Sequence, residues 1–489
     1  MKINISYQPI ISEKGVQLLS QNRQFQFFQS PTYIYPVVPA YAATLLANAG
    51  YEVIWDDGIA EEKSYSQWLK DLEQSSPDVV MIETKTPVVK RHWVMVNDIK
   101  KVLPSAKVVL VGDHVTALPS ESMKQSEVDF VLTGGDYDFL LLNLVDFLNE
   151  KMKHLEPGVW YREGGDIKNT GQFVLKHSLD ELPHIDRDLT KWSLYSERNG
   201  NFKVTPGTYT MAGRDCWWRR GGGCTFCSWP TLYPTFRVVK PERLADEIGL
   251  LIERHGVKTV FDDTGCFPAG EWLRKFARLM IDRGYNKQVE FSCNMRFGAL
   301  TQDDYRLIRQ AGFRMLLFGV ESASQATLDK LNKGTTVDGI ISECQVAREE
   351  GLEPHITIMV GYPWETRKDA LSTLNLAKML MEKGWATTLQ STMVTPYPGS
   401  RLYTEALQKK WFRINPTDYG RFDMKEPVLS TPDMTSEEVL MICDEVYKVF
   451  LSPKYLLKQF VRIRSLRDVR YSVKGDMKVL GHIKDFARN

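Results

Sequence analysis

Short apolar runs alternate with amphipathic stretches through the first third of the chain. The runs are rich in Val, Ile and Leu, which is typical of strands buried on both faces. The stretches between them have helical periodicity, and buried strands alternating with helices predict a doubly wound parallel sheet. The expected strands are Lys2–Tyr7, Tyr51–Trp55, Asp78–Ile82, Lys107–Gly112 and Asp129–Gly135, and the expected helices are Ala40–Gly50, Ser66–Gln74, Trp93–Leu103 and Phe139–Leu148.

A second series of strand–helix units begins near residue 204. The six expected strands are Gly207–Ala212, Thr259–Asp262, Glu290–Cys293, Met315–Gly319, Pro354–Val360 and Thr388–Thr392. Six strands with crossover helices predict a full or partial TIM-type barrel, whose active groups lie at the C-terminal ends of the strands. We therefore expect an α/β N-terminal domain over 1–150, a linker over 151–203, a barrel over 204–425 and a helical extension over 426–489.

The composition of the 489 residues is that of a soluble globular protein, with 43% hydrophobic and 25% charged residues. A formal net charge of +1 provides no global field for nucleic acid, so no nucleic-acid partner is expected. Residues 24–51 are uncharged, but Pro31, Pro36 and Pro39 favour a loop followed by a buried helix over a membrane span. The seven cysteines and the lack of a signal peptide favour a reducing cytoplasm, where cysteine clusters bind metals.

Cys216, Cys224 and Cys227 form a C-x7-C-x2-C motif directly after the first expected barrel strand. Three thiolates can hold three irons of a [4Fe–4S] cluster and leave the fourth iron open to a ligand. The rival interpretation is a structural zinc site, which needs four ligands, and no second C-x2-C or nearby His completes one. Cys266 follows the second barrel strand and is a candidate fourth ligand, a reactive thiol or a packing residue.

With the aromatic Phe226 just before Cys227, this motif resembles that of the radical S-adenosylmethionine (SAM) enzymes. The preceding α/β domain resembles the cobalamin-binding, Rossmann-like domain of their B12-binding subclass, and a partial (β/α)6 barrel would follow it. The first gap of the motif is four residues longer than the usual C-x3-C-x2-C spacing of the family. The longer loop, Trp217–Gly223, either shapes the substrate side of the pocket or packs outside the cluster.

The resemblance implies an enzyme that reductively cleaves SAM at a [4Fe–4S] cluster and produces a 5′-deoxyadenosyl radical. It further implies cobalamin-dependent C-methylation of an unactivated carbon. Radical cyclisation, oxygenation or carbon–carbon coupling without methyl transfer stays open, as does a non-catalytic cobalamin or iron–sulfur sensor.

The resemblance also implies site residues. Besides the three cysteines, the residues implied for SAM are Phe226, Asp262, Asp263, Thr264, Asn294, Arg296, Glu321 and Gly361. The residues implied for cobalamin, in the loops after the N-terminal strands, are Thr84, Thr86, Gly112, His114, Val115, Gly134 and Gly135. The motif D-x-H-x-x-G of other B12 proteins is missing, so no protein histidine is expected on the lower face of the cobalamin.

The implied partners are a small-molecule or lipid substrate and an electron donor such as flavodoxin or ferredoxin. Residues 454–489 are basic with an apolar side, which fits either peripheral membrane contact or a helix capping the barrel. His355 is expected to pack in the core. Tyr362, Trp364, Tyr397 and Tyr403 are expected to line the substrate cavity or to close the barrel.

Overall fold

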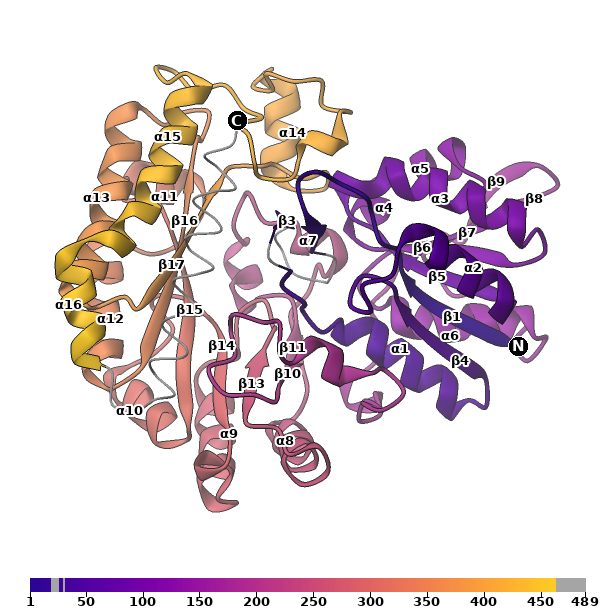
Figure 1. Cartoon of the computed structure of the whole chain (residues 1–489), viewed down its shortest axis with the longest axis horizontal. Helices are drawn as coiled ribbons and strands as arrows, with labels where there is room; N and C mark the ends of the chain where they lie inside the picture. The colour runs from indigo at the N-terminus through magenta and orange to yellow at the C-terminus, as the bar shows by residue number, and fades with distance from the viewer. Residues whose placement is uncertain (19–25, 30, 463–489) are drawn as a thin grey trace.

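The computed structural model describes residues 1–18, 26–29 and 31–462. Two domains lie side by side, with the N-terminal domain drawn in violet and the barrel in magenta to orange (Figure 1). The predicted fold class, a doubly wound sheet followed by a partial barrel, is confirmed. Among the described residues, no helix is long and apolar enough to cross a membrane.

The N-terminal sheet has seven strands in the order β4-β1-β5-β6-β7-β8-β9. The first five are parallel, and the hairpin β8–β9 adds two antiparallel strands at one edge. The hairpin lies within 151–203, so the sheet extends past the linker boundary expected at residue 150. The bounds are β1 Lys2–Tyr7, β4 Glu52–Asp57, β5 Val79–Glu83, β6 Lys107–Val111, β7 Phe130–Leu132, β8 Val159–Glu163 and β9 Asp166–Asn169.

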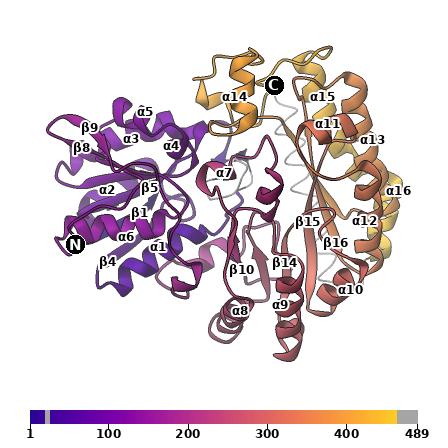
Figure 2. The same cartoon turned by 180° about the vertical axis from the view of Figure 1, so that it is seen from behind.

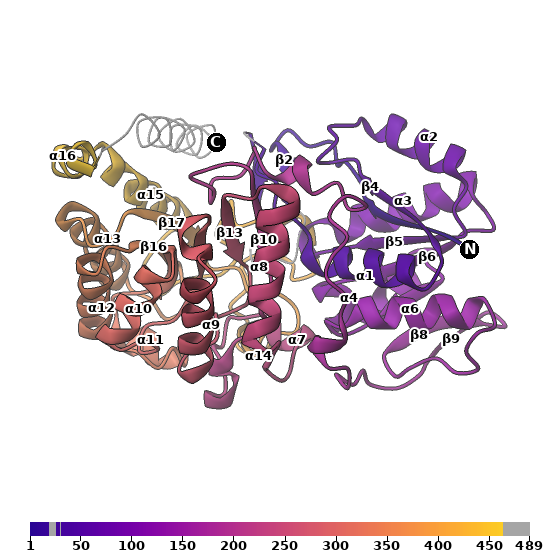
Figure 3. The same cartoon turned by 90° about the horizontal axis from the view of Figure 1, so that it is seen from below.

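Helices cover both faces of this sheet, as the continuous apolar strands predict. Figure 3 shows α1 (Val37–Asn48) and α6 (Tyr137–Leu148) on one face and α2 (Tyr65–Ser75) and α3 (Val89–Val102) on the other. The strand order reverses direction between β1 and β5, and open parallel sheets bind ligands at such a switch point, beyond the carboxyl ends of the strands.

The barrel sheet has six parallel strands in the order β10-β13-β14-β15-β16-β17. No pairing joins β10 to β17 in the described part of the chain, so the barrel is open on that side. All six strands lie where the apolar runs predict them. Their bounds are β10 Gly207–Thr210, β13 Thr259–Asp262, β14 Glu290–Met295, β15 Phe313–Glu321, β16 Glu353–Val360 and β17 Thr388–Met393.

Amphipathic helices cover the outside of the barrel, as Figure 2 shows from behind. They are α8 Pro241–His255, α9 Glu271–Asp282, α10 Gln302–Gln310, α11 Gln325–Lys330, α12 Val337–Glu349 and α13 Arg367–Lys383. The extension predicted to be helical contributes α15 (Ser436–Tyr447) and α16 (Pro453–Arg462), and α15 packs on β17 and α13. Residues 463–489, most of the predicted basic tail, lie outside the described residues.

A buried ionic network joins the two domains. Arg214, in the short strand β11 (Gly213–Arg214), contacts both Asp136 and Asp138 at the start of α6, and its Nη1–Asp136 Oδ1 distance is 2.6 Å. Arg237 donates to Asp136 as well, with an Nη1–Oδ2 distance of 2.8 Å. Arg214 is two residues before Cys216, so the N-terminal domain braces the chain that leads into the cysteine motif.

Candidate active site

The three motif cysteines open on one cavity of about 360 Å³ inside the barrel. Cys216, Cys224 and Cys227 line it and are partly exposed, whereas the other four cysteines are buried. Burial raises the pKa of the Cys266 and Cys293 thiols well above its usual value, so these two stay protonated. The motif therefore holds the cysteines that are accessible to a cofactor.

Local structure brings the three cysteines together despite the long first gap. Strand β11 pairs with β12 (Arg237–Val238), which fixes the chain two residues before Cys216. The 3-10 helix η4 (Trp217–Gly221) then takes up most of the gap, and Gly222 and Gly223 follow with positive φ angles of 86° and 67°. Glycine adopts this left-handed conformation without steric cost, so the chain can turn back to Cys224.

Two roles were expected for the long loop Trp217–Gly223: shaping the pocket or packing outside the cluster. In the structure the loop contributes to the cavity wall and also packs on the loop around Asn332. Trp218, Arg219 and Gly223 line the cavity. The Trp218 indole donates to the Asn332 carbonyl at 2.7 Å, and the Asn332 amide donates to the carbonyls of Gly221 and Gly223 at 2.7 and 2.8 Å. The loop is thus held in one conformation.

Two guanidinium groups lie beside the cysteines. Arg296 Nη1 is 3.7 Å from Cys224 Sγ, and the guanidinium lies 4.3 Å from the centre of a Trp218 ring. Arg219 donates to both carboxylate oxygens of Asp215, at 2.7 and 2.8 Å. Iron binds cysteine in its thiolate form, so these two cations lie where the negative charge of a bound cluster would be.

Among residues 1–18, 26–29 and 31–462, no three His, Cys, Asp or Glu side chains converge on a point that could hold one metal ion. A zinc ion needs all its thiolates within about 2.3 Å of one centre. An iron–sulfur cluster spreads them, because each thiolate binds a different iron.

The structure brings five of the eight residues implied for SAM to this cavity. Phe226, Asp263, Asn294, Arg296 and Glu321 all line it, at or just beyond the C-terminal ends of β13, β14 and β15 or in the cysteine motif. Asp262, Thr264 and Gly361 are not among its lining residues.

Asp262 and Thr264 instead brace the strand ends from within the core. The Asp262 carboxylate accepts hydrogen bonds from Thr210 Oγ1 at 2.9 Å and from the Ala212 amide at 2.8 Å, and burial raises its pKa to about 6. Thr264 Oγ1 accepts from the Gly213 amide at 2.9 Å. Their hydrogen bonds reach β10 and the start of the cysteine motif, which indicates a positioning role.

Glu321 ends β15 in an unusual conformation, with φ of +64° in a residue that is not glycine. Its carboxylate pairs with the Lys333 ammonium at 2.8 Å, and both groups are buried in the cavity wall. Positive φ at a non-glycine residue is costly and is commonest at functional sites. The pair adds one charge of each sign beside Phe226, whose ring centre is 5.8 Å from the Lys333 nitrogen.

The seven residues implied for cobalamin lie in the loops after β5, β6 and β7, outside the barrel cavity. His114 is fully buried, its ring nitrogens lie 3.1 Å from Thr86 Oγ1 and 3.3 Å from Glu121 Oε2, and Tyr419 covers its ring edge. The Tyr233 ring packs against Gly135, and the Phe173 ring packs against Gly134. The space that the missing side chains of Gly134 and Gly135 leave is therefore filled by Phe173 and Tyr233.

The switch point of the N-terminal sheet holds polar atoms with no partner. Gln8 directly follows β1 and Thr84 directly follows β5, the two strands between which the order reverses. Both residues are fully buried, and neither the Gln8 side-chain amide nor Thr84 Oγ1 has a hydrogen-bond partner among the described residues. Buried polar groups are normally satisfied, so unsatisfied ones at a switch point fit a polar ligand there.

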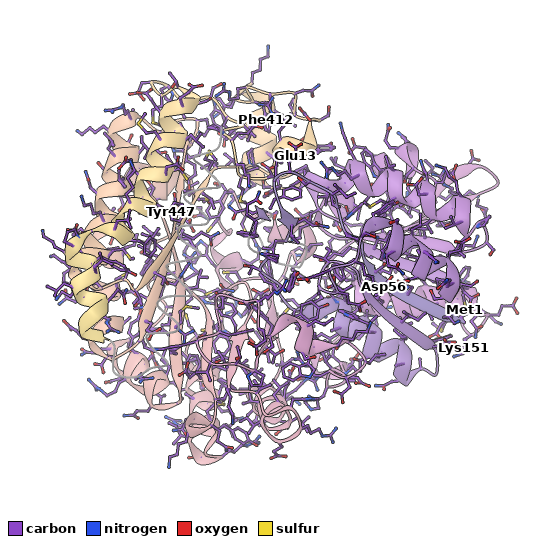
Figure 4. All side chains as sticks on the ribbon, viewed as in Figure 1. Met1, Glu13, Asp56, Lys151, Phe412 and Tyr447 are labelled. Atoms are coloured by element: carbon purple, nitrogen blue, oxygen red, sulfur yellow. The ribbon has the colours of Figure 1, made fainter. Side chains whose placement is uncertain are left out.

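Several cavity residues were not expected from the sequence. Phe28 and Ile34 come from the long segment after β1, Asn199 comes from the linker, and Tyr447 ends α15. In Figure 4, Tyr447 is labelled between the yellow helices and the barrel, and its hydroxyl donates to the Ser391 carbonyl at 2.9 Å. Tyr33, close to Ile34 in the sequence, meets the linker where the Asn199 amide donates to the Tyr33 carbonyl at 2.6 Å.

His355 was expected in the core, but it lines the cavity. Of the four aromatic residues expected to line the cavity or close the barrel, Tyr397 lines it, whereas Tyr362, Trp364 and Tyr403 pack in the barrel-side core. The sequence did contain a signal for His355. In the run His355–Met359, His355, Thr357 and Met359 alternate with isoleucines, so these three side chains lie on one face of the strand.

Residues 213–377 match the radical SAM superfamily. These residues, which include the cysteine motif and most of the barrel, are therefore a radical SAM domain. The superfamily uses a [4Fe–4S] cluster and SAM, and the three cysteines and the polar strand ends of this chain line one cavity.

Two relatives extend the likeness along most of the chain. An uncharacterized methyltransferase of Pyrococcus horikoshii is 26% identical over 450 residues, which is 91% of this chain and 94% of the relative. An anaerobic magnesium-protoporphyrin IX monomethyl ester cyclase of Cereibacter sphaeroides is 25% identical over 435 residues, covering 86% of this chain and 68% of that protein.

Solved structures share the arrangement of both domains. The radical SAM methyltransferase TsrM from Kitasatospora setae, with cobalamin and a [4Fe–4S] cluster bound, has a TM-score of 0.68 at 14% identity and covers 92% of this chain and 89% of its own. The cobalamin-dependent radical SAM enzyme OxsB has a TM-score of 0.71 at 13% identity, covering 98% and 72%. At these identities the likeness shows the fold.

Proposed function

We propose that this radical SAM enzyme performs cobalamin-dependent C-methylation of an unactivated carbon in a small-molecule or lipid substrate. The observation that supports it most is one cavity that joins three partly exposed cysteines to the polar strand ends of the barrel. The α/β domain beside it has the strand order and the unsatisfied switch-point groups of a ligand-binding sheet. The full-length relative named as a methyltransferase favours the same outcome.

Cys216, Cys224 and Cys227 would hold the cluster, which supplies the electron that cleaves SAM when both are bound. The residues of the chain have positioning and electrostatic tasks. Arg296 holds a positive charge beside Cys224, and its stacking on Trp218 fixes the guanidinium in place. Asp263 and the Glu321–Lys333 pair offer both signs of charge to the amino and carboxylate groups of SAM.

For the cobalamin, we propose a site at the carboxyl edge of the N-terminal sheet, with Gln8 and Thr84 added to Thr86, Gly112 and Val115, since Phe173 and Tyr233 already cover Gly134 and Gly135. Cobalamin supplies a cobalt centre that can carry a methyl group. His114 already has a partner at each ring nitrogen, so it acts here as a brace for the Thr86 loop. Its packing under Tyr419 also ties this edge to the chain that follows the barrel.

The test is anaerobic reconstitution followed by turnover with SAM that carries a deuterated methyl group. Methyl transfer predicts a product heavier by the labelled methyl, formed only when cobalamin is present. A product that lacks the label, with 5′-deoxyadenosine still formed, would favour the radical outcomes without methyl transfer. Full cluster and cobalamin content without any 5′-deoxyadenosine would favour the non-catalytic sensor.

Radical cyclisation is the second candidate, because the cyclase relatives match most of the chain at 25% and 23% identity. The same labelled SAM separates it from methylation, since a ring closure leaves the label in methionine. We also propose a cytoplasmic location and a flavodoxin or ferredoxin as electron donor, because a radical SAM cluster needs a low-potential reductant and none of the seven cysteines, all of them within residues 31–462, forms a disulfide.

Peripheral membrane contact is a separate proposal about α16. Its Leu456 and Leu457 side chains are exposed beside Lys454, which is the pattern of an interfacial helix. Flotation with anionic liposomes tests it: the full chain should float, and a chain that ends before Lys454 should not. Equal flotation of both would contradict this proposal.

A further inference from the structure

One wall of the cavity carries three polar side chains with unmet hydrogen-bonding capacity. His355 and Thr357 alternate on the inner face of β16, and Gln390 is the register partner of Thr357 on β17. The residues between them on β16, Pro354 and Ile356, are buried on the outer face. The three side chains therefore form one patch of the inner barrel wall.

His355 lines the cavity, and one of its ring nitrogens has no partner among the described residues. Its Nδ1 lies 2.8 Å from Thr388 Oγ1, while Nε2 is buried and has no hydrogen-bond partner in the described part of the chain. Burial lowers the pKa of His355 to about 4, so the ring is neutral near pH 7. A buried and unsatisfied ring nitrogen is costly, which makes a ligand the simplest explanation for it.

Thr357 and Gln390 complete the patch. Neither side chain makes a hydrogen bond to residues 1–18, 26–29 or 31–462, although both line the cavity. Together with His355, they offer both donors and acceptors and no net charge. Leu317, Met359 and Leu389 surround them with apolar surface.

The charged residues of the cavity lie toward the carboxyl ends of the strands, and the Glu321–Lys333 pair lies beside Gly319, the register partner of Thr357. The ionised lining residues are Arg219, Asp263, Arg296, Glu321 and Lys333, all at the carboxyl ends of strands or in the loops beside the cysteines. The lining residues of β16 and β17 include no Asp, Glu, Lys or Arg. An ionic group brought against His355 would lose its hydration, and the neighbouring Glu321 and Lys333 are already paired with each other at 2.8 Å, so its burial is unfavourable.

We propose that His355, Thr357 and Gln390 form a subsite for an uncharged hydrogen-bonding group of the substrate, such as an amide, alcohol or carbonyl, flanked by apolar atoms. This inference depends on the proposed function in one respect: it assumes that the molecule bound at the subsite is the substrate. It places the polar anchor of that substrate on β16 and β17, next to the Glu321–Lys333 pair on the neighbouring β15 side.

The test uses reconstituted full-length enzyme and three probes with one ring and different charge: benzamide, benzoate and benzamidine. Ligand-observed NMR in the presence of SAM measures their affinities. We expect benzamide to bind at least ten times more tightly than either charged probe. His355→Phe and Thr357→Val should each weaken benzamide at least fivefold, and the exposed control His154→Leu should not change it.

Thr357→Val is nearly isosteric, so it reports on the subsite even if His355→Phe fails to fold. Benzoate or benzamidine binding as tightly as benzamide, no binding of any probe, or unchanged benzamide affinity in Thr357→Val would overturn the subsite. Formation of 5′-deoxyadenosine by the unaltered enzyme is measured in the same samples. Its absence would count against the proposed function, whereas the probe affinities count for or against the subsite alone.

Discussion

At the scale of single residues, side chains buried behind the cavity position the residues that line it. Glu365 is fully buried, and its Oε2 accepts a hydrogen bond from the Gly361 amide at 2.9 Å, while its Oε1 has no partner in the described part of the chain. Gly361 directly follows β16 with φ of +93°. The carboxyl group of Glu365 thus sets the course of the chain that leaves β16.

Glu365→Gln should make the protein more stable at alkaline pH. Burial raises the pKa of Glu365 from its ordinary value of 4.5 to about 7. Between these two pH values the folded state keeps a proton that the unfolded state has lost. Stability contributed by this group is present at low pH and is lost as pH rises toward 7. Glutamine keeps an acceptor for the Gly361 amide and does not ionise.

Relative to the unaltered chain, the variant should gain up to about 3 kcal/mol in free energy of unfolding between pH 5 and pH 8. Urea unfolding at the two pH values measures the gain. Glu73→Gln, at an exposed position, is the control and should show no such gain. A pH dependence of Glu365→Gln identical to that of the unaltered chain would contradict the argument.

Cys266 should be dispensable for the cluster. It is buried, does not line the cavity, and its thiol points to the Phe267 carbonyl at 3.8 Å, although its backbone bridges to Cys216. Cys266→Ala is expected to retain the iron and acid-labile sulfide of the unaltered protein after reconstitution. A loss as large as that of Cys216→Ala would make Cys266 a ligand.

At the scale of secondary-structure elements, the sequence predicted most of the regular structure and little of what connects it. The apolar runs predicted all six barrel strands, because each strand is rich in apolar residues that are buried in the fold. The hairpin β8–β9 was assigned to the linker, since nothing local shows that Val159–Glu163 pairs with β7. The conformation of η4 depends on Asn332 and Arg401, which are far away in the sequence, so no local pattern could predict it.

The ion-paired contact between β11 and α6 gives a prediction at this scale. Burial raises the pKa of Asp138, while two arginines hold that of Asp136 below its usual value despite burial. Arg214→Met leaves Asp138 buried without its cation, which should cost about 3–5 kcal/mol of stability. The double variant Arg214→Met with Asp138→Leu replaces the pair by apolar groups and should recover much of that loss.

Thermal unfolding and iron content measure the two variants. The single variant should lose iron as well as stability, because Arg214 is two residues before Cys216. A single variant as stable as the unaltered protein, or a double variant less stable than the single one, would show that this contact does not hold the domains together.

At the scale of the whole molecule, the cavity is built by residues from Leu18 to Tyr447, so only the folded chain assembles it. The three cysteines stand out by their spacing, whereas the eight residues expected for SAM come from the family resemblance, and five of them line the cavity. The subsite of His355, Thr357 and Gln390 could not be found from the sequence, because it depends on the register of two strands and on an open barrel edge. The cobalamin site stays a prediction, supported by the unsatisfied groups at the β1–β5 switch point.

The central claim is that Cys216, Cys224 and Cys227 hold a cluster that cleaves SAM. The most direct measurement is 5′-deoxyadenosine formed anaerobically from SAM and dithionite by the reconstituted enzyme and by single Cys→Ala variants. The unaltered enzyme and Cys344→Ala, which alters a buried helical cysteine, should both form 5′-deoxyadenosine, and each of the three motif variants should lose at least 99% of it. Full activity in any motif variant, or none in the iron-replete unaltered enzyme, would contradict the account.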